Sequence, residues 1–191
     1  DEALFLENAG VDAIVVSGLE AGGHRPSFLK SAEDSLVGAF SLIPTVRDKV
    51  ALPIISAGGI ADSRGIQAAM ALGADAVQVG TAFLACKESG ASPAHRQLIL
   101  DNQTESGVLS RAYTGRLARF LENDITRHYL NNPCKLLPFP LQSWLMSAVK
   151  KEAILSGDQE TLGAYSGQSS SIVKHDSAKE LMRALSAPFR S

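Results

Sequence analysis

The feature that most constrains the fold is a ten-residue pattern that occurs twice in the chain. Residues 9–18 read AGVDAIVVSG and residues 72–81 read LGADAVQVGT. In both copies a glycine, one further residue and Asp-Ala precede an apolar run that a second glycine closes. A helix commonly ends at such a first glycine, and the apolar run is typical of a buried strand. The pattern therefore predicts two helix–turn–strand units, the repeating element of a parallel α/β sheet.

Three short apolar runs are predicted to be parallel strands covered on both faces. They are residues 12–17, 53–57 and 76–80. A helix is expected between the last two, begun by Asp62 or Ser63 and ended by Gly73. Pro44 lies between the first two strands, so we expect no single straight helix there. The fold class is therefore α/β, either an open doubly wound sheet or a (β/α)8 TIM barrel.

A complete barrel takes about 250 residues, and three strands cannot close one. If the fold is a barrel, we expect this chain to hold its C-terminal half only. The opening DEALFLENAG agrees with that expectation, because it reads as a helix that is already under way at the first residue and it has no initiator methionine. The chain is therefore expected to be a fragment.

Strand signals stop after Glu88, and helices are expected near residues 92–102, 141–155 and 177–186. We assign residues 1–90 to the C-terminal βα units of a barrel with a phosphate site. Residues 91–191 are assigned to a helical C-terminal appendage and closing segment of the same domain. The appendage is not separated as a domain, because the sequence gives it no apolar core of its own.

Composition excludes several classes of partner. The formal charge is −2 with 45% hydrophobic residues, so no basic excess favours nucleic acid. No apolar run is long enough to cross a bilayer, and we expect no membrane partner. Cys86 and Cys134 lack the spacing of metal ligands, so we expect reduced thiols and no metal site. The sequence leaves the oligomeric state open.

Two glycine-rich turns carry the strongest chemical signal. SAGGIADSRG (56–65) and QVGTAF (78–83) each place glycine directly after a predicted strand and before a helix. Glycine lets the backbone approach a ligand, and free N–H groups at a helix start attract anions. Tight-turn geometry would explain one such turn, but two consecutive ones favour a shared phosphate cradle.

The loop GLEAGGHRPSF (18–28) should lie at the same sheet edge as the two turns. His24 is either a general base, for which its ordinary pKa of about 6.5 is suited, or a loop histidine without chemistry. Glu20 either orients the imidazole or is solvated, and Arg25 either holds an anionic substrate or pairs with Glu20. The other histidines stand in polar helical contexts and are interpreted as surface residues. They are His95, His128 and His175.

Together, GLEAGGHRPSF, the stretch from PIISAGGIADSRG to AHRQLI, SRAYTGRLARF and YSGQS resemble the class I nitronate monooxygenases, also called nitropropane dioxygenases. The resemblance runs from Gly10 to about Gln168. It implies an FMN-dependent TIM barrel, cytoplasmic in location. It also implies that alkyl nitronates such as propionate 3-nitronate are oxidised by O₂ to a carbonyl compound and nitrite.

The resemblance implies that His24 is the active-site base or a substrate-binding group. It places Ser17, Gly22 and Gly23 along the flavin, although Ser17 stands where the family often has Gln. Gln168 would approach the ring, beside Tyr165 where relatives often carry Trp, and Pro26 replaces the usual Gly. The residues implied for the phosphate and ribityl chain are Gly58, Gly59, Gln78, Val79, Gly80 and Thr81.

Three other functions remain open. An FMN-type enoyl-[acyl-carrier-protein] reductase shares the barrel, a GGH loop and a QVGT turn, but would consume NAD(P)H. A non-catalytic flavin- or phosphate-binding barrel would make no use of His24. A barrel of the inosine monophosphate dehydrogenase type is disfavoured, because no cysteine follows the AGGI strand closely.

Overall fold

Three parallel strands form the main sheet of the computed structural model, which describes residues 1–101, 107–132 and 135–189. The strands are β1 (Ile14–Ser17), β3 (Ile54–Ala57) and β4 (Ala76–Gln78), hydrogen-bonded in that order. Ile14 pairs with Ile54, and Ile55 pairs with Ala76. All three strands expected from the sequence are confirmed, each with slightly narrower bounds.

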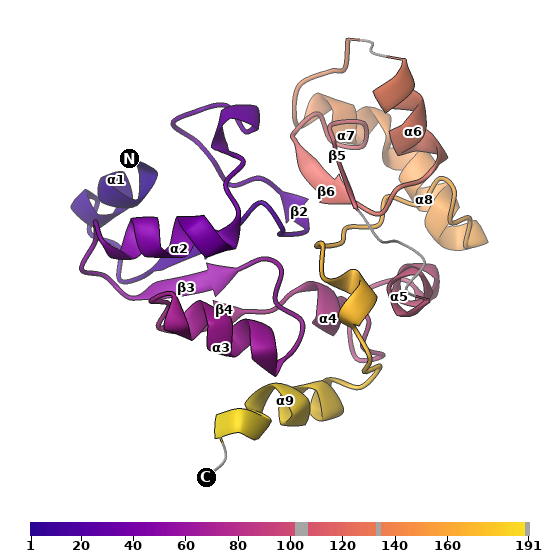
Figure 1. Ribbon diagram of the computed structural model, residues 1–191. Helices are drawn as coiled ribbons and strands as arrows, with labels where there is room; N and C mark the ends of the chain where they lie inside the picture. The colour runs from indigo at the N-terminus through magenta and orange to yellow at the C-terminus, as the bar shows by residue number, and fades with distance from the viewer. Residues whose placement is uncertain (102–106, 133–134, 190–191) are drawn as a thin grey trace.

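Helices cover one face of this sheet (Figure 1). They are α1 (Glu2–Asn8), α2 (Ala39–Arg47) and α3 (Ser63–Ala71). Ile14, Val16 and Ile54 point to this side and are almost fully buried, as alternation along a strand requires. Val15 belongs to the opposite face and is 49% exposed. Within the described residues, the expected covering of both faces is therefore wrong: one face of the parallel sheet is partly open.

The helix α2 contradicts the expected break at Pro44. It runs through Pro44 as one element, with Gly38 at its N-terminal cap position. Proline removes a backbone donor from a helix interior. The buried side chains Ile43 and Val46 on either side hold the helix against the sheet, so packing outweighs this loss.

A second, antiparallel sheet follows the βα units, and the prediction that no strand lies beyond Glu88 is wrong. It is formed by β2 (Gly23–His24), β6 (Ala118–Phe120) and β5 (Val108–Ser110), in that order. Strands of three residues are too short to show a period, and β6 carries Arg119 at its centre. In Figure 1, β2 reaches from the parallel sheet towards β6 and joins the two parts of the molecule.

The remaining helices are shorter than the sequence suggests. Between β4 and β5 lie α4 (Thr81–Leu84) and α5 (Pro93–Leu100). The helix expected at 141–155 is divided at Met146 into α7 (Leu141–Leu145) and α8 (Ser147–Ser156). The others are α6 (Asp124–Asn131), α9 (Ala178–Ser186) and the single-turn 3₁₀ helices η1 (Glu33–Ser35), η2 (Ser170–Ile172) and η3 (Ala187–Phe189).

Two hydrophobic clusters stabilise the molecule. The larger lies between the parallel sheet and its helices, and Leu181 and Leu185 of α9 return to join it. The smaller contains Tyr113, Phe120 and Met146, so the expectation that the C-terminal half has no core of its own is wrong. The assignment of residues 91–191 to the same domain stays a prediction.

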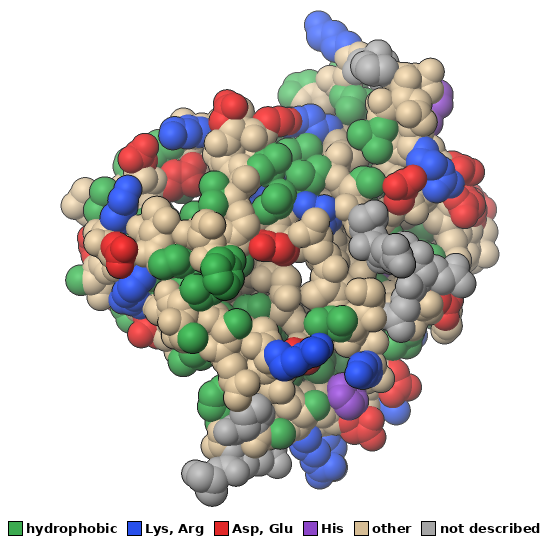
Figure 2. All heavy atoms as spheres, in the orientation of Figure 1, with side chains coloured by type: hydrophobic (Ala, Val, Ile, Leu, Met, Phe, Trp, Pro, Cys, Tyr) green, Lys and Arg blue, Asp and Glu red, His purple; other side chains and the backbone are tan. Residues whose placement is uncertain are grey.

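The surface charges and the described cysteine give little indication of function. Basic and acidic side chains are interspersed on the face shown in Figure 2, as a net charge of −2 suggests. Over the described ranges, no helix has the length and apolar character to cross a membrane. Cys86 is a buried free thiol. Cys134 lies outside the described residues.

Candidate active site

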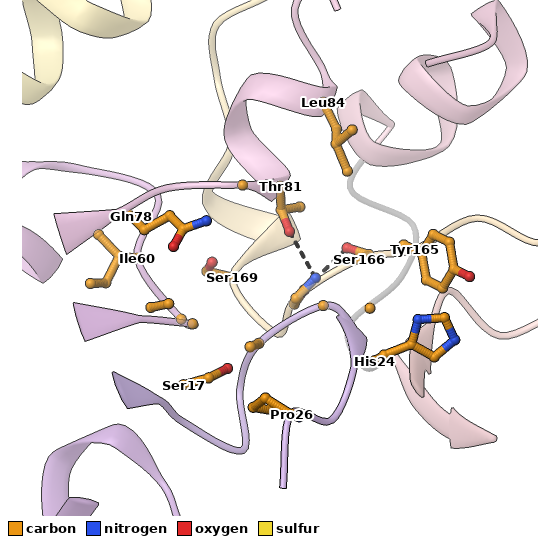
Figure 3. Close-up of a pocket in the computed structure, with 18 of the residues that line it drawn as sticks. Ser17, His24, Pro26, Ile60, Gln78, Thr81, Leu84, Tyr165, Ser166 and Ser169 are labelled. Atoms are coloured by element: carbon orange, nitrogen blue, oxygen red, sulfur yellow. Dashed lines mark hydrogen bonds between the residues drawn. The ribbon is translucent and has the colours of Figure 1, made fainter. Parts of the chain in front are cut away.

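A pocket of about 430 Å³ lies at the carboxyl edge of the parallel strands (Figure 3). Four segments form its wall: the loop after β1, the turns after β3 and β4, and residues 165–169. Ligand sites in open and closed α/β folds form at this edge, and the volume is that of a small-molecule site. The described residues contain no group of three or more His, Cys, Asp or Glu able to hold a metal.

Most of the residues singled out in the sequence lie on this wall. They are His24, Ser17, Gly22, Gly23, Gly58, Gly59, Gln78, Gly80 and Thr81. Val79 packs against the large hydrophobic cluster instead. The side chain of Gln168 is exposed, while its backbone N–H donates to the Glu20 carbonyl at 2.9 Å.

The turn after β3 requires glycine for two reasons. Gly58 and Gly59 have φ values of +98° and +71°, which side-chain-bearing residues rarely adopt. A Cβ at Gly58 would also lie 2.8 Å from the backbone nitrogen of Ala21. The turn therefore packs directly on the loop that carries His24.

The N-terminus of α3 is already occupied by a side chain. The Asp62 carboxylate accepts from the backbone N–H groups of Arg64 and Gly65 at 3.0 and 3.3 Å. This confirms Asp62 as the cap residue. The amides left for an anion are those of Gly58, Gly59 and Gly80 in the turns and of Thr81, the first residue of α4. The described part of the chain supplies no backbone acceptor for them.

The wall fits a phosphate-bearing ligand. A Cβ built on Gly80 meets no atom within 4 Å, so the space in front of this turn is empty of protein. Among the described residues that line the pocket, none is Asp, Glu, Lys or Arg. A phosphate there would meet backbone amides and hydroxyl groups, with no carboxylate to repel it.

Residues 165–169 close the pocket, and only Tyr165 and Gln168 of this stretch were predicted from the sequence. Gly167 donates its N–H to Thr81 Oγ1 at 2.8 Å. A Cβ on Gly22 would lie 2.6 Å from the Gly167 nitrogen, so the two segments touch through their backbones. Ser166, Gly167 and Ser169 on the wall were missed. The Ser-Gly pair within YSGQS was the available signal for them.

His24 stands at one end of the pocket, beside Tyr165 (Figure 3). Its backbone pairs with Ala118 of β6, and its Nε2 lies 2.9 Å from Thr114 Oγ1. The ring contacts Tyr165 and Phe139, with centroid distances of 5.7 and 5.9 Å. Although His24 is exposed as a residue, its ring is partly buried, and this partial burial, followed by the positive charges of Arg116 and Lys150, lowers the pKa of His24. The imidazole is therefore neutral at physiological pH.

The contacts of Arg25 and Glu20 fit neither of the two roles that the sequence suggested for each residue. Arg25 is 3% exposed and donates to the carbonyl oxygens of Ser17 and Gly18 at 3.0 and 2.9 Å. Both carboxylate oxygens of Glu20 lie within hydrogen-bond distance of the Ala39 N–H, at 3.0 and 2.9 Å, where α2 begins. Both side chains therefore fix the shape of the loop.

His95 is not the surface residue that its sequence context predicted. It is half-buried, and its Nε2 lies 2.8 Å from the carbonyl oxygen of Tyr165. Burial lowers the pKa of this imidazole. His128 is exposed, whereas His175 is half-buried on the wall of a small cavity beside α9. His95 thus supports the segment that closes the pocket.

Comparison with known proteins identifies the family to which the chain is similar. A family model described as nitronate monooxygenase matches residues 1–187. A "Probable nitronate monooxygenase" of Staphylococcus aureus (strain Newman) is 41% identical over 183 residues, covering 95% of this chain and 52% of that protein. The protein of the same name from Bacillus subtilis (strain 168) is 39% identical, covering 97% and 54%.

Solved structures agree with these relatives. Nitroalkane oxidase from Streptomyces ansochromogenes superposes with a TM-score of 0.90 at 38% identity, covering 97% of this chain and 54% of that one. FabK from Thermotoga maritima superposes with a TM-score of 0.77 at 32% identity, covering 98% and 57%. The chain spans about half the length of the relatives it matches. On the family model and on these identities, the chain belongs to the nitronate monooxygenase family.

Proposed function

We propose that this chain carries the cofactor and substrate site of an FMN-dependent nitronate monooxygenase. The reaction would take an alkyl nitronate such as propionate 3-nitronate, together with O₂, to a carbonyl compound and nitrite. The observation that carries the proposal is the position of His24 on the wall of a pocket built from two glycine turns. We also propose that β1, β3 and β4 are successive strands of a (β/α)8 barrel.

The free amides of the two turns are the groups that would bind the FMN phosphate. They belong to Gly58, Gly59, Gly80 and Thr81. Ser17, Gln78 and the backbone of Gly22 and Gly23 would lie along the rest of the cofactor. Val79 and Gln168 are left out of this set, because their side chains point to the core and to solvent.

Bound flavin would supply the electron-accepting ring that oxidation of the nitronate requires. The chain itself would supply position and one acid–base group. An anionic nitronate needs no base, whereas a neutral nitroalkane must first lose a proton. A neutral His24 is suited to accept that proton, and its lowered pKa keeps it unprotonated near neutrality.

Substitution of Gly80 by alanine tests the phosphate site. Because a Cβ there meets no protein atom, Gly80→Ala is expected to leave the melting temperature unchanged while lowering FMN affinity about tenfold or more. Gly90→Ala is the matched control, since its Cβ is also unobstructed but lies outside the pocket. Unchanged affinity in Gly80→Ala would contradict this assignment.

The reaction is tested by anaerobic mixing of the full-length, FMN-loaded protein with propionate 3-nitronate and, separately, with NADPH. Loss of the oxidised-flavin absorbance with the nitronate alone is the expected result. Reduction by NADPH alone would instead favour the reductase alternative. A preparation that retains no flavin at all would refute both.

A further inference from the structure

The hydroxyl group of Thr114 has three hydrogen-bonding contacts, two with the backbone of Arg116 and one with His24. It donates to the Arg116 carbonyl at 3.0 Å and accepts from the Arg116 N–H at 3.3 Å. A hydroxyl has one hydrogen and two lone pairs, so a single lone pair remains. When the hydroxyl hydrogen points to the Arg116 carbonyl, as this geometry favours, His24 Nε2, at 2.9 Å, is the donor to Thr114. The imidazole then carries its hydrogen on Nε2.

Thr114 is held rigidly enough to impose this choice. It is 3% exposed, and the turn that contains it is closed by the Gly115 N–H donating to the Arg111 carbonyl at 2.8 Å. The Arg25 N–H donates to the Leu117 carbonyl at 2.9 Å, and the Arg116 guanidinium donates to the Arg25 carbonyl at 2.9 and 3.2 Å. The backbone beside His24 is thus fixed to the same turn.

We propose that Thr114 is a positioning residue that holds His24 as the Nε2–H tautomer, so that Nδ1 is the proton acceptor of the pocket. Thr114 bonds Nε2, which leaves Nδ1 for a ligand in the pocket whose wall His24 helps to form. This inference rests on the proposed function. It adds the identity of the basic nitrogen and the residue that selects it.

The proton transfer that follows is specific. A neutral nitroalkane loses the hydrogen of its α carbon to His24 Nδ1, and the electron pair of that C–H bond moves onto the nitro group. The products are a nitronate anion and an imidazolium ion. The groups that face the ring are Tyr165, Phe139, Arg116 and Lys150, and no carboxylate of the described residues acts on it. Deprotonated His24 is therefore the resting state.

The test compares Thr114→Val with Thr114→Ser in the full-length protein. Valine keeps the shape and removes the acceptor, whereas serine restores the hydroxyl. Thr45→Val is the control, because the Thr45 hydroxyl bonds only within the exposed surface of α2. ¹⁵N spectra of histidine-labelled protein, with His24 assigned from His24→Asn, report the tautomer without any substrate.

The expected result has two parts. Wild-type and Thr114→Ser protein show His24 with hydrogen on Nε2, and Thr114→Val shows a mixture of tautomers. In Thr114→Val, kcat for a neutral nitroalkane falls about five- to tenfold with KM changed less than about twofold, as loss of one orienting hydrogen bond implies. Turnover of the preformed nitronate changes less.

Hydrogen on Nδ1 in the wild-type protein would overturn the proposal, and so would a tautomer that Thr114→Val leaves unchanged. If Thr114→Val does not fold, the wild-type and Thr114→Ser spectra still decide. The Nε2–H tautomer in a protein that oxidises neither nitronate nor nitroalkane would refute the proposed function and leave the assignment of Thr114 standing.

Discussion

His24 is placed so that its neutral form is favoured by several independent effects. Burial of the ring disfavours the charged imidazolium, and the nearby cations Arg116 and Lys150 disfavour it further. A histidine that works as a base beside a carboxylate would be shifted in the opposite direction. The surroundings of this residue are therefore those of a proton acceptor at neutral pH.

The pH dependence of turnover follows from the direction of this shift. Since the folded-state pKa lies below the ordinary value of about 6.5, kcat/KM for a neutral nitroalkane should rise with pH through that lowered pKa and be level above it. His24→Asn should lower this rate by about 10²–10⁴-fold and flatten the profile. A rise centred above the ordinary histidine pKa would contradict the assignment.

Residue types in the sequence pointed to the residues of the pocket wall, but not to their hydrogen-bond partners. The histidine of GGH, the glycines of AGGI and three of the four QVGT residues lie on the pocket wall. The roles of Arg25 and His95 were missed, because their acceptors are backbone carbonyls. The partners of His24 and His95 lie 90 and 70 residues away along the chain. No local pattern encodes such pairings.

At the scale of elements, the pocket depends on how closely two loops approach. Loop 18–26 and segment 165–169 contact each other through Gly22 and Gly167, with no room for a side chain between them. A hydrogen bond from the Gln168 N–H to the Glu20 carbonyl, at 2.9 Å, also links the two loops. These loops therefore fix the width of the pocket.

Gly22→Ala tests this contact. The added Cβ would lie 2.6 Å from backbone atoms of Ser166 and Gly167, so the loops must separate. We expect a loss of about 1–3 kcal/mol in the free energy of unfolding, together with weaker FMN binding. Denaturant unfolding and flavin titration measure the two effects. Gly90→Ala should change neither, and a Gly22→Ala protein as stable as wild type would contradict the packing described here.

Strands could be predicted from the sequence where their apolar runs were long enough. β1, β3 and β4 are apolar runs that a glycine follows, and all three were predicted. β5 and β6 are three residues each, and Arg119 in β6 reads as a surface residue although it is 4% exposed. Its guanidinium donates to the Gly107 and Leu19 carbonyls at 2.7 and 2.9 Å. β5 and β6 pair with each other locally, but the addition of β2 to this sheet is a long-range contact that no local sequence pattern contains.

For the molecule as a whole, the open face of the parallel sheet is the main structural liability. Parallel sheets are usually covered on both faces, yet Val15 on the pocket side is 49% exposed. Phe139, Trp144 and Leu145 around α7 are further exposed apolar side chains. This chain spans about half the length of the relatives it matches.

Expression of these 191 residues alone tests the importance of that face. We expect the isolated chain to bind a hydrophobic dye strongly, to bind FMN at well below one equivalent, and to show no nitronate turnover. The full-length protein, treated identically, is the control. Stoichiometric FMN and measurable turnover in the isolated chain would show that the open face does not matter.

The strand β2 has a consequence for the order in which the protein assembles. It contains only Gly23 and His24, and its partner β6 lies more than 90 residues later in the chain. Contacts of such long range form late in folding, because the intervening chain must first be ordered. Short pairings of this kind also open by local fluctuation more readily than core strands. The backbone that carries the base is therefore expected to be among the last parts to become protected from hydrogen exchange during refolding, and among the first to exchange in the native state.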